Sequence, residues 1–127
     1  MKKALLILND SLKNLEEIRQ LFVDLGYEVQ VTGSAKEGLP LGKKFGPEII
    51  VYDFAIRSEE PEVITSVLHF EFPQTRLIVI NGQMPRYINN KVSLGAEKIF
   101  IASSAVADIH AVLKKMERQE TESELMC

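Results

Sequence analysis

Five short apolar runs alternate with longer segments in which apolar residues recur at three- and four-residue steps. The runs cover residues 4–8, 29–32, 49–52, 77–80 and 99–102. Four of them are apolar at nearly every position, which is typical of parallel strands covered by helices on both faces of a sheet. The second run alternates polar and apolar residues, so we place it at an edge. Right-handed crossovers then predict a flavodoxin-like α/β fold, a doubly wound (βα)5 parallel sheet in the strand order 2-1-3-4-5.

Helical periodicity fills the gaps between these runs. The first helix should end at Gly26, which supplies a left-handed C-terminal cap, and a third should cover residues 61–70. A fourth helix, expected over residues 85–94, has few apolar anchors and should pack loosely. The last helix should begin at Ser103 or Ser104. The pattern therefore predicts a helix after every strand.

The second helix carries conflicting signals. Ser34 begins a capping box with Glu37, but Gly38, Pro40 and Gly42 stand where the helix should continue. Proline lacks the N–H that a helix needs and its ring crowds the preceding turn, at a cost of roughly 3 kcal/mol in a helix interior. We therefore expect a short, kinked or largely irregular helix.

Length and charge limit the class of protein. The 127 residues fit one domain, which we place at residues 1–118, followed by a polar tail at residues 119–127. A net charge of -3, with no run of Lys or Arg longer than a pair, argues against binding to nucleic acid or to an acidic membrane surface. The N-terminal apolar run is too short to cross a membrane, and a single cysteine, Cys127, permits no intramolecular disulfide. We therefore expect a soluble, cytoplasmic protein.

Acidic and amide side chains follow the first and third strands. In an open α/β sheet, ligands bind beyond the carboxyl ends of the strands where the winding reverses, which here lies between these two strands. Asn9 and Asp10 follow the first strand, and Asp53 follows the third. Two carboxylates brought together there would repel, and Mg²⁺ is one remedy because it prefers oxygen ligands. Proton sharing and separate hydrogen bonding remain the alternatives.

Five stretches occur in order along the chain: "KALLILND", "LGYEVQVTGSAKEGL", "PEIIVYDF", "LIVING" and "LGAEKIFIASS". With them the chain resembles the receiver domain of bacterial response regulators (CheY-like) over roughly residues 2–118. "KALLILND" is similar to the family's first strand with its acidic pair, and "PEIIVYDF" to the strand that ends in the phospho-accepting aspartate. "LGYEVQVTGSAKEGL" resembles the second strand and helix. "LIVING" resembles the fourth strand with its hydroxyl residue, and "LGAEKIFIASS" the Gly-Ala turn and the fifth strand with its lysine. The resemblance implies a single-domain signalling module of a two-component or phosphorelay system.

The resemblance also assigns a site. Asp53 falls on the phospho-acceptor, which in this family receives a phosphoryl group from a phosphohistidine donor. Asp10, Asp53 and the backbone carbonyl of Ala55 fall on the positions that hold Mg²⁺. The implied chemistry is at most a Mg²⁺-dependent self-phosphorylation, so we do not class the protein as an enzyme.

Several positions depart from the family pattern. The first acid of the pair is Asn9, the hydroxyl residue is Asn81 and the lysine is Ala102. The proline expected four residues after the acceptor is Arg57, and the aromatic switch position is Ile99. Fold features are thus retained while the residues that support phosphorylation are replaced.

These departures weaken the expected chemistry. Phosphoryl transfer requires cations and donors that neutralise the charge on the phosphoryl oxygens, and losing a well-placed one commonly costs about 10²-fold in rate. Ala102 offers neither charge nor hydrogen bond, whereas Asn81 can still donate through its amide. Arg57 is either a replacement cation or a solvated loop residue. We therefore predict a pseudo-receiver with weak, atypical or absent phosphorylation of Asp53.

Two alternatives to this function remain open. One is a working response regulator that is phosphorylated on Asp53. The other is a flavodoxin-like binder of a small molecule, which is disfavoured because no glycine-rich phosphate loop follows the first strand.

The resemblance implies protein partners. The expected partners are a sensor kinase or an output protein, and homodimerisation through the predicted fourth and fifth helices is a further possibility. Tyr87, Phe100 and Ile109 would form the interaction face if they are exposed together, with ordinary packing as the alternative. Because side chains alternate along a strand, Phe100 should face away from the side on which Ile99 lies.

Overall fold

A parallel sheet forms the centre of the molecule. The computed structural model of the chain describes residues 2–82 and 98–126, and in this part the strand order is β2-β1-β3-β4-β5. The strands are β1 (Lys2–Ile7), β2 (Tyr27–Thr32), β3 (Ile49–Asp53), β4 (Arg76–Ile80) and β5 (Lys98–Ile101). The predicted fold class and strand order are confirmed, and the alternating strand β2 lies at an edge as predicted.

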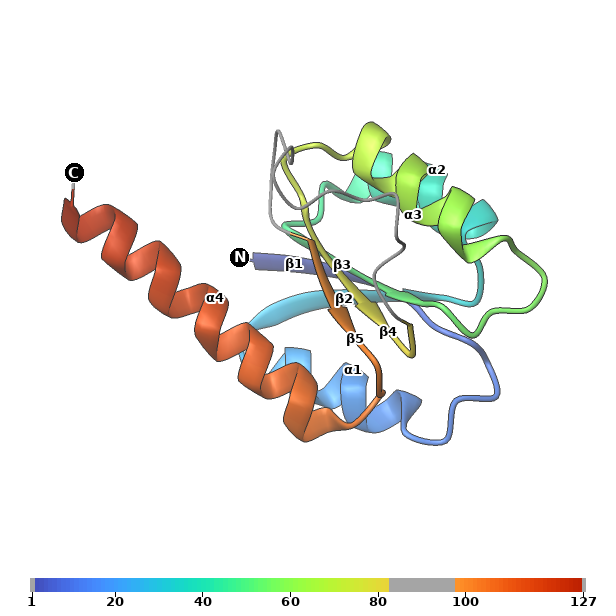
Figure 1. Ribbon diagram of the computed structural model, residues 1–127, viewed down its shortest axis with the longest axis horizontal. Coiled ribbons are helices and arrows are strands. Elements are labelled where there is room, and N and C mark those ends of the chain that lie inside the picture. Colours follow the sequence, from blue (N-terminus) through green and yellow to red (C-terminus); the bar gives the residue numbers. More distant parts are fainter. Residues whose placement is uncertain (1, 83–97, 127) are drawn as a thin grey trace.

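Helices cover both faces of this sheet. They are α1 (Leu15–Asp24), α2 (Ala35–Phe45), α3 (Pro61–Glu71) and α4 (Val106–Met126). Figure 1 shows α2 and α3 on one face and α1 and α4 on the other. Gly26, directly after α1, has a φ of 92°, as the predicted left-handed cap requires. The helix predicted over residues 85–94 lies outside the described residues.

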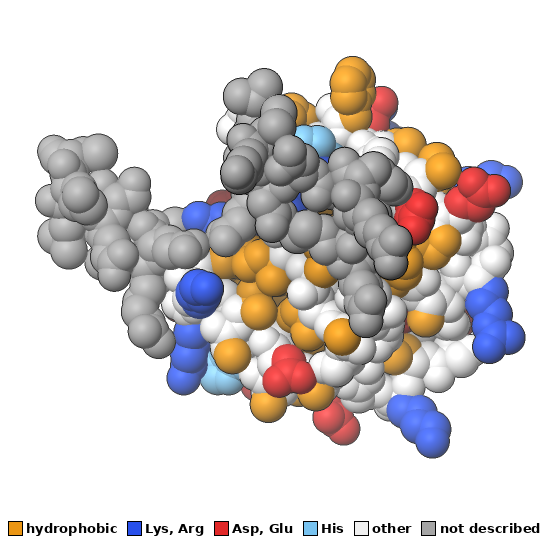
Figure 2. Space-filling view, viewed as in Figure 1, with side chains coloured by type: hydrophobic (Ala, Val, Ile, Leu, Met, Phe, Trp, Pro, Cys, Tyr) orange, Lys and Arg blue, Asp and Glu red, His pale blue; other side chains and the backbone are white. Residues whose placement is uncertain are grey.

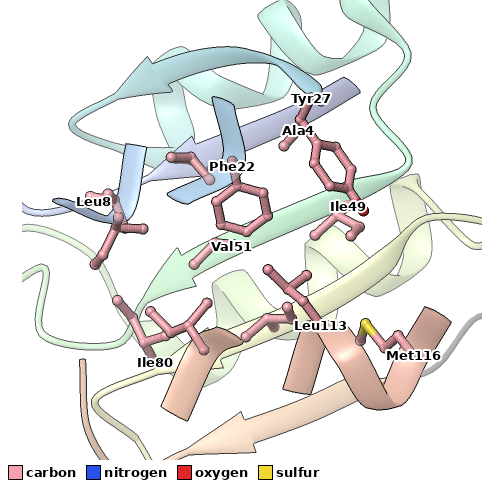
Figure 3. Packing of buried hydrophobic residues seen from close by; sticks show 13 residues of the cluster. Ala4, Leu8, Phe22, Tyr27, Ile49, Val51, Ile80, Leu113 and Met116 are labelled. Carbon is pink, nitrogen blue, oxygen red and sulfur yellow. The ribbon is translucent and has the colours of Figure 1, made fainter. Parts of the chain in front are cut away.

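The two faces of the sheet bury separate apolar clusters because successive side chains of each strand point in opposite directions. The α1/α4 core, shown in Figure 3, consists of Ala4, Leu6, Leu8, Ile18, Phe22, Tyr27, Ile49, Val51, Ile78, Ile80, Ile109, Leu113 and Met116. The α2/α3 core consists of Leu5, Ile7, Ala35, Ile50, Tyr52, Ile56, Leu68, Leu77 and Val79. Strands β1, β3 and β4 contribute to both cores, which explains why their sequences are apolar at nearly every position.

Helix α4 is longer than its apolar pattern predicts. Met116 is the last buried apolar residue among the side chains that the structure describes, and the helix continues to Met126. Figure 1 shows its C-terminal part extending beyond the sheet. The polar segment after residue 118 thus continues the helix, and the predicted domain boundary at that residue stays a prediction. In the part of the chain that the structure describes, every helix is too short or too polar to span a bilayer.

The second helix is neither short nor irregular, because α2 runs over 11 residues through Pro40, while the predicted kink stays a prediction. Ser34 caps it as predicted, since its hydroxyl accepts the N–H of Glu37 at 3.3 Å. Gly38 and Gly42 are buried on the face that packs on β1. A Cβ atom at Gly38 would come within 2.8 Å of Ile7 Cδ1. The two glycines therefore allow close approach to the sheet and do not end the helix.

Pro40 lies on the exposed side of α2, where water can solvate the carbonyl of Lys36 that its missing N–H leaves without a partner. Replacing Pro40 with alanine should restore that hydrogen bond and raise the free energy of unfolding by about 1–2 kcal/mol. Urea denaturation followed by circular dichroism measures this change. Pro73→Ala, in an exposed turn, is the matched control and should be neutral or slightly destabilising. Equal effects of the two substitutions would contradict the prediction.

Candidate functional site

The candidate site lies at the carboxyl end of the sheet, between β1 and β3. The chain leaves β1 toward β2 on one side, and β3 lies on the other, so the winding reverses at this point. Asp53 is the last residue of β3 and its side chain is 0% exposed. A buried carboxylate is costly unless it is hydrogen-bonded or paired, so its partners define the site.

Among the described residues, three N–H groups donate to the carboxylate of Asp53. The backbone N–H of Asn9 donates to Oδ2 at 3.1 Å. The backbone N–H of Ala55 and the side-chain amide of Asn81 donate to Oδ1, at 2.9 and 3.1 Å respectively. Hydrogen bonds to an ionised acceptor are stronger than those between neutral groups. Both oxygens are therefore engaged within the protein, and this compensates for their removal from water.

The backbone conformation of Asn81 directs its amide toward Asp53. Asn81 has a φ of 58°, in the left-handed region that asparagine tolerates better than most residues. Its backbone N–H donates to the carbonyl of Ser103, and the N–H of Gly82 donates to the carbonyl of Ile101, both at 3.3 Å. These bonds tie the end of β4 to β5. The Asn81 amide thus donates to Asp53 itself, through a positive φ that was not predicted, while its predicted donation to a phosphoryl group stays a prediction.

Asn9 joins the end of β1 to the loop after β3. Besides its backbone bond to Asp53, its Nδ2 donates to the carbonyl of Ala55 at 3.3 Å. Its Oδ1 accepts the N–H of Ser11 at 3.0 Å, which fixes the side chain in an Asx turn. Asn9, Asp53, Ala55 and Asn81 therefore form one hydrogen-bonded cluster, named here the Asp53 cluster.

Asp10 is exposed and lies toward the end of β2. A Cβ atom built on Gly33 would come within 2.7 Å of Asp10 Oδ1, so the missing side chain of Gly33 gives this carboxylate its space. Among the described residues, Asp10 forms no hydrogen bond with the Asp53 cluster. The approach of Asp10 to Asp53 stays a prediction.

The oxygens that the resemblance assigns to Mg²⁺ already accept N–H groups. The Ala55 carbonyl accepts the Asn9 amide, and the Asp53 oxygens accept N–H groups from three residues. Each carboxylate or carbonyl oxygen has two lone pairs, so these donors compete with a cation without excluding it, and the Mg²⁺ site of Asp10, Asp53 and Ala55 stays a prediction. Within residues 2–82 and 98–126, no three Asp, Glu, His or Cys side chains gather as a metal-binding group.

The remaining positions of the expected site lie at the surface or pack against the two cores. Ala102 is exposed directly after β5, and Arg57 is exposed on the loop after Asp53. Ile99 packs against the α1/α4 core and Phe100 against the α2/α3 core, so the two side chains face opposite sides of the sheet as predicted.

The predicted interaction face is corrected by the structure. Ile109 is fully buried in the α1/α4 core because its side of α4 packs on the sheet. Phe100 lies on the opposite side of the sheet, so the two residues share no exposed patch. Tyr87 lies outside the described residues.

Exposed apolar side chains occur instead on α3. Phe70 is 83% exposed and Val63 is 52% exposed. A groove of about 290 Å³ is lined by Ser66, Val67, Phe70 and Glu71. Figure 2 shows hydrophobic side chains projecting at the upper edge of the molecule, where Figure 1 places α3. The outer side of this helix thus presents two large apolar side chains among its polar ones, where a solvent-facing helix is normally polar.

Sequence reasoning missed Glu59. Its carboxylate accepts the backbone N–H groups of Ala35 and Lys36 at the start of α2, at 2.9 and 3.1 Å, and the hydroxyl of Tyr52 at 3.2 Å. Burial of the Tyr52 phenol, together with the nearby charge of Glu59, raises the pKa of Tyr52. A tyrosine inside an apolar strand needs a hydrogen-bond partner for its hydroxyl. Tyr52 was therefore the residue in the sequence from which a nearby polar partner could have been predicted.

Several solved structures with a similar fold are receiver domains. The chain is similar to a response regulator receiver domain protein from Methanospirillum hungatei, with a TM-score of 0.68 and 21% identity, covering 96% of this chain and 98% of that one. It is also similar to a receiver domain from Methylobacillus flagellatus, with a TM-score of 0.66 and 13% identity over 91% and 98% of the two chains. The N-terminal domain of a response regulator protein from Carboxydothermus hydrogenoformans matches with a TM-score of 0.64 and 17% identity over 96% and 98%.

At these identities the similarity establishes the fold. No protein-family model matches the chain, and no curated protein matches it either. The chain therefore has the CheY-like receiver fold, with the candidate acceptor Asp53 at the end of β3.

Proposed function

We propose that this protein is a receiver-like signalling module that acts through protein contacts and does not depend on phosphorylation of Asp53. The observation that carries the proposal is the state of the Asp53 carboxylate, which is fully buried and has both oxygens engaged by N–H donors. A phospho-acceptor needs one oxygen available as the nucleophile, with cations placed around the incoming phosphoryl group. Here each oxygen accepts at least one N–H group, and these donors compete with the roles of nucleophile and cation ligand.

The substitutions around Asp53 support the same proposal. Asn9 replaces an acid and binds the carbonyl of Ala55, which would otherwise be available to Mg²⁺. Ala102 supplies no charge at the end of β5. Both changes remove groups that stabilise phosphoryl transfer, while the hydrogen bonds of Asn9 and Asn81 stabilise the unmodified carboxylate.

Protein contacts are the remaining route for a signal in this fold. The proposed partners are a sensor kinase or an output protein in the cytoplasm, and the exposed apolar side chains of α3 offer one surface for such contacts. Homodimerisation through the helix predicted over residues 85–94 and the last helix, α4, stays a prediction.

Incubation with Mg²⁺ and acetyl phosphate, followed by intact mass measurement, tests the proposal. The wild-type protein should gain no phosphoryl group. The triple variant Asn9→Asp, Asn81→Thr, Ala102→Lys, which restores the family pattern, should gain one phosphoryl group and lose this ability when Asp53→Asn is added. A gain by the wild-type protein that Asp53→Asn abolishes would instead favour a working phospho-acceptor.

Magnesium titration of the same proteins gives an independent readout. Ligands that bind only the folded state raise the melting temperature. Mg²⁺ should therefore leave the melting temperature of the wild-type protein unchanged and raise that of the Asn9→Asp variant. A rise in the wild-type protein would show that Mg²⁺ displaces the Asn9 amide.

A further inference from the structure

The loop between β3 and α3 is held at both of its ends. This loop, residues 54–60, is named here the strap. At its beginning, Ala55 donates its N–H to Asp53 and accepts the side-chain amide of Asn9. Near its end, Glu59 binds the start of α2. Between the two ends, Ile56 is 4% exposed and packs in the α2/α3 core.

Glu59 satisfies polar groups that would otherwise lack partners. The first N–H groups of any α-helix have no partner within the helix. In α2, Ser34 accepts the N–H of Glu37, and Glu59 accepts those of Ala35 and Lys36. The positive end of the helix dipole favours a carboxylate at this place. Two caps, one local and one from the strap, therefore share the start of α2.

Tyr52 adds a buried donor to the same carboxylate. Its side chain is fully buried in the α2/α3 core and its hydroxyl donates to Glu59 Oε1 at 3.2 Å. A buried hydroxyl left without an acceptor costs about 1–3 kcal/mol. Tyr52 and the start of α2 thus hold Glu59 from two directions, while Glu59 itself remains half-exposed.

We propose that Glu59 is a latch that holds the strap closed and couples the Asp53 cluster to α2. Among the described residues, the strap bonds to a strand through the backbone N–H of Phe54, which donates to the carbonyl of Ile80 in β4. Between Ala55 and Glu59 it is held by Ile56, whose side chain lies in the α2/α3 core and whose carbonyl accepts the N–H of Glu59 at 3.4 Å. Opening the latch would free the segment that positions Ala55 against Asp53. Coupling between two sites is reciprocal, so a change in the charge of Asp53 should also loosen the contact of Glu59 with α2. This inference goes beyond the proposed function because it holds whether or not Asp53 is phosphorylated.

Native-state amide hydrogen exchange tests the coupling residue by residue. In Glu59→Gln, protection of the Ala35 and Lys36 amides should fall at least tenfold, and protection of the Ala55 amide should fall with it. In Asp53→Asn, the Ala35 and Lys36 amides should lose protection although no hydrogen bond joins them to Asp53. The matched control Glu60→Gln changes an exposed neighbour whose side chain caps no helix, and it should leave all three amides unchanged.

Rescue with acetate separates a latch from a simple helix cap. In Glu59→Ala, acetate should restore protection of the Ala35 and Lys36 amides in a saturable manner, because it replaces the missing carboxylate. It should not restore the Ala55 amide, because a free acetate is not joined to the strap. The proposal is overturned if Ala55 keeps wild-type protection in Glu59→Gln, or if acetate restores it in Glu59→Ala. Should Glu59→Ala fail to fold, the Glu59→Gln data decide alone.

Discussion

Replacing Asn81 with aspartate is expected to lower the free energy of unfolding by about 3 kcal/mol or more. The substitution keeps the shape of the side chain and its tolerance of a positive φ, so the backbone can stay as it is. It removes the donor that lies 3.1 Å from Asp53 Oδ1 and places a second carboxylate there. Chemical denaturation followed by circular dichroism at pH 7 measures the loss.

Asn81→Gly is the control for this prediction. Glycine also accepts the positive φ but only removes the donor, so the difference between the two variants isolates the repulsion between carboxylates. The aspartate variant should recover stability as the pH falls from 7 to 5, because the folded pair then binds a proton that the unfolded chain releases. Equal stability of the two variants at every pH would show that position 81 does not face Asp53.

Replacing Asp53 with asparagine should cost about 1.5–3 kcal/mol of stability. Three donors converge on the two oxygens of this carboxylate, and an asparagine has only one oxygen to offer them. In the best orientation, its NH₂ group faces the N–H of Asn9 and leaves that buried donor without an acceptor. Asp24→Asn, on the exposed side of α1, is the matched control and should change stability by less than about 0.5 kcal/mol.

The sign of the Asp53 result distinguishes two accounts of the site. A buried charge that is poorly compensated makes its own removal stabilising, as the desolvation penalty disappears. A carboxylate that is well supplied with donors makes removal destabilising. If Asp53→Asn stabilises the protein, the N–H donors do not compensate the buried charge of Asp53. A bound cation would then be the more plausible partner of this carboxylate.

The sheet could be predicted from the sequence because its signal is local and repeated. Each buried strand is apolar at nearly every position, and the one alternating strand marks the edge. The right-handedness of the crossover connections then leaves few possible orders for five parallel strands in one sheet. The position of Asp53 between β1 and β4 follows from that order without any knowledge of its contacts.

The wrong predictions concern residues whose role depends on a contact with another element of the fold. Gly38 and Gly42 read as helix breakers, but their lack of a side chain is what lets α2 pack on β1. The sequence of α4 indicates an apolar face that includes Ile109, but it does not indicate that the sheet covers this face. Glu59 reads as a loop acid because its partners, Ala35 and Lys36, lie more than twenty residues earlier. Such pairings across the sequence have no periodicity that a pattern can reveal.

The burial of Tyr52 gives the strap an optical reporter. The chain contains no tryptophan and three tyrosines, so its near-ultraviolet absorbance comes largely from phenol groups. Because burial and Glu59 raise the pKa of Tyr52, this phenol should stay protonated in alkaline solution in which an exposed tyrosine, with a pKa of about 10, has ionised. Because burial is the larger cause, Glu59→Gln should lower the pH at which Tyr52 phenolate absorbance appears without bringing it down to that of an exposed tyrosine, so the contact with Glu59 can be followed without adding a label.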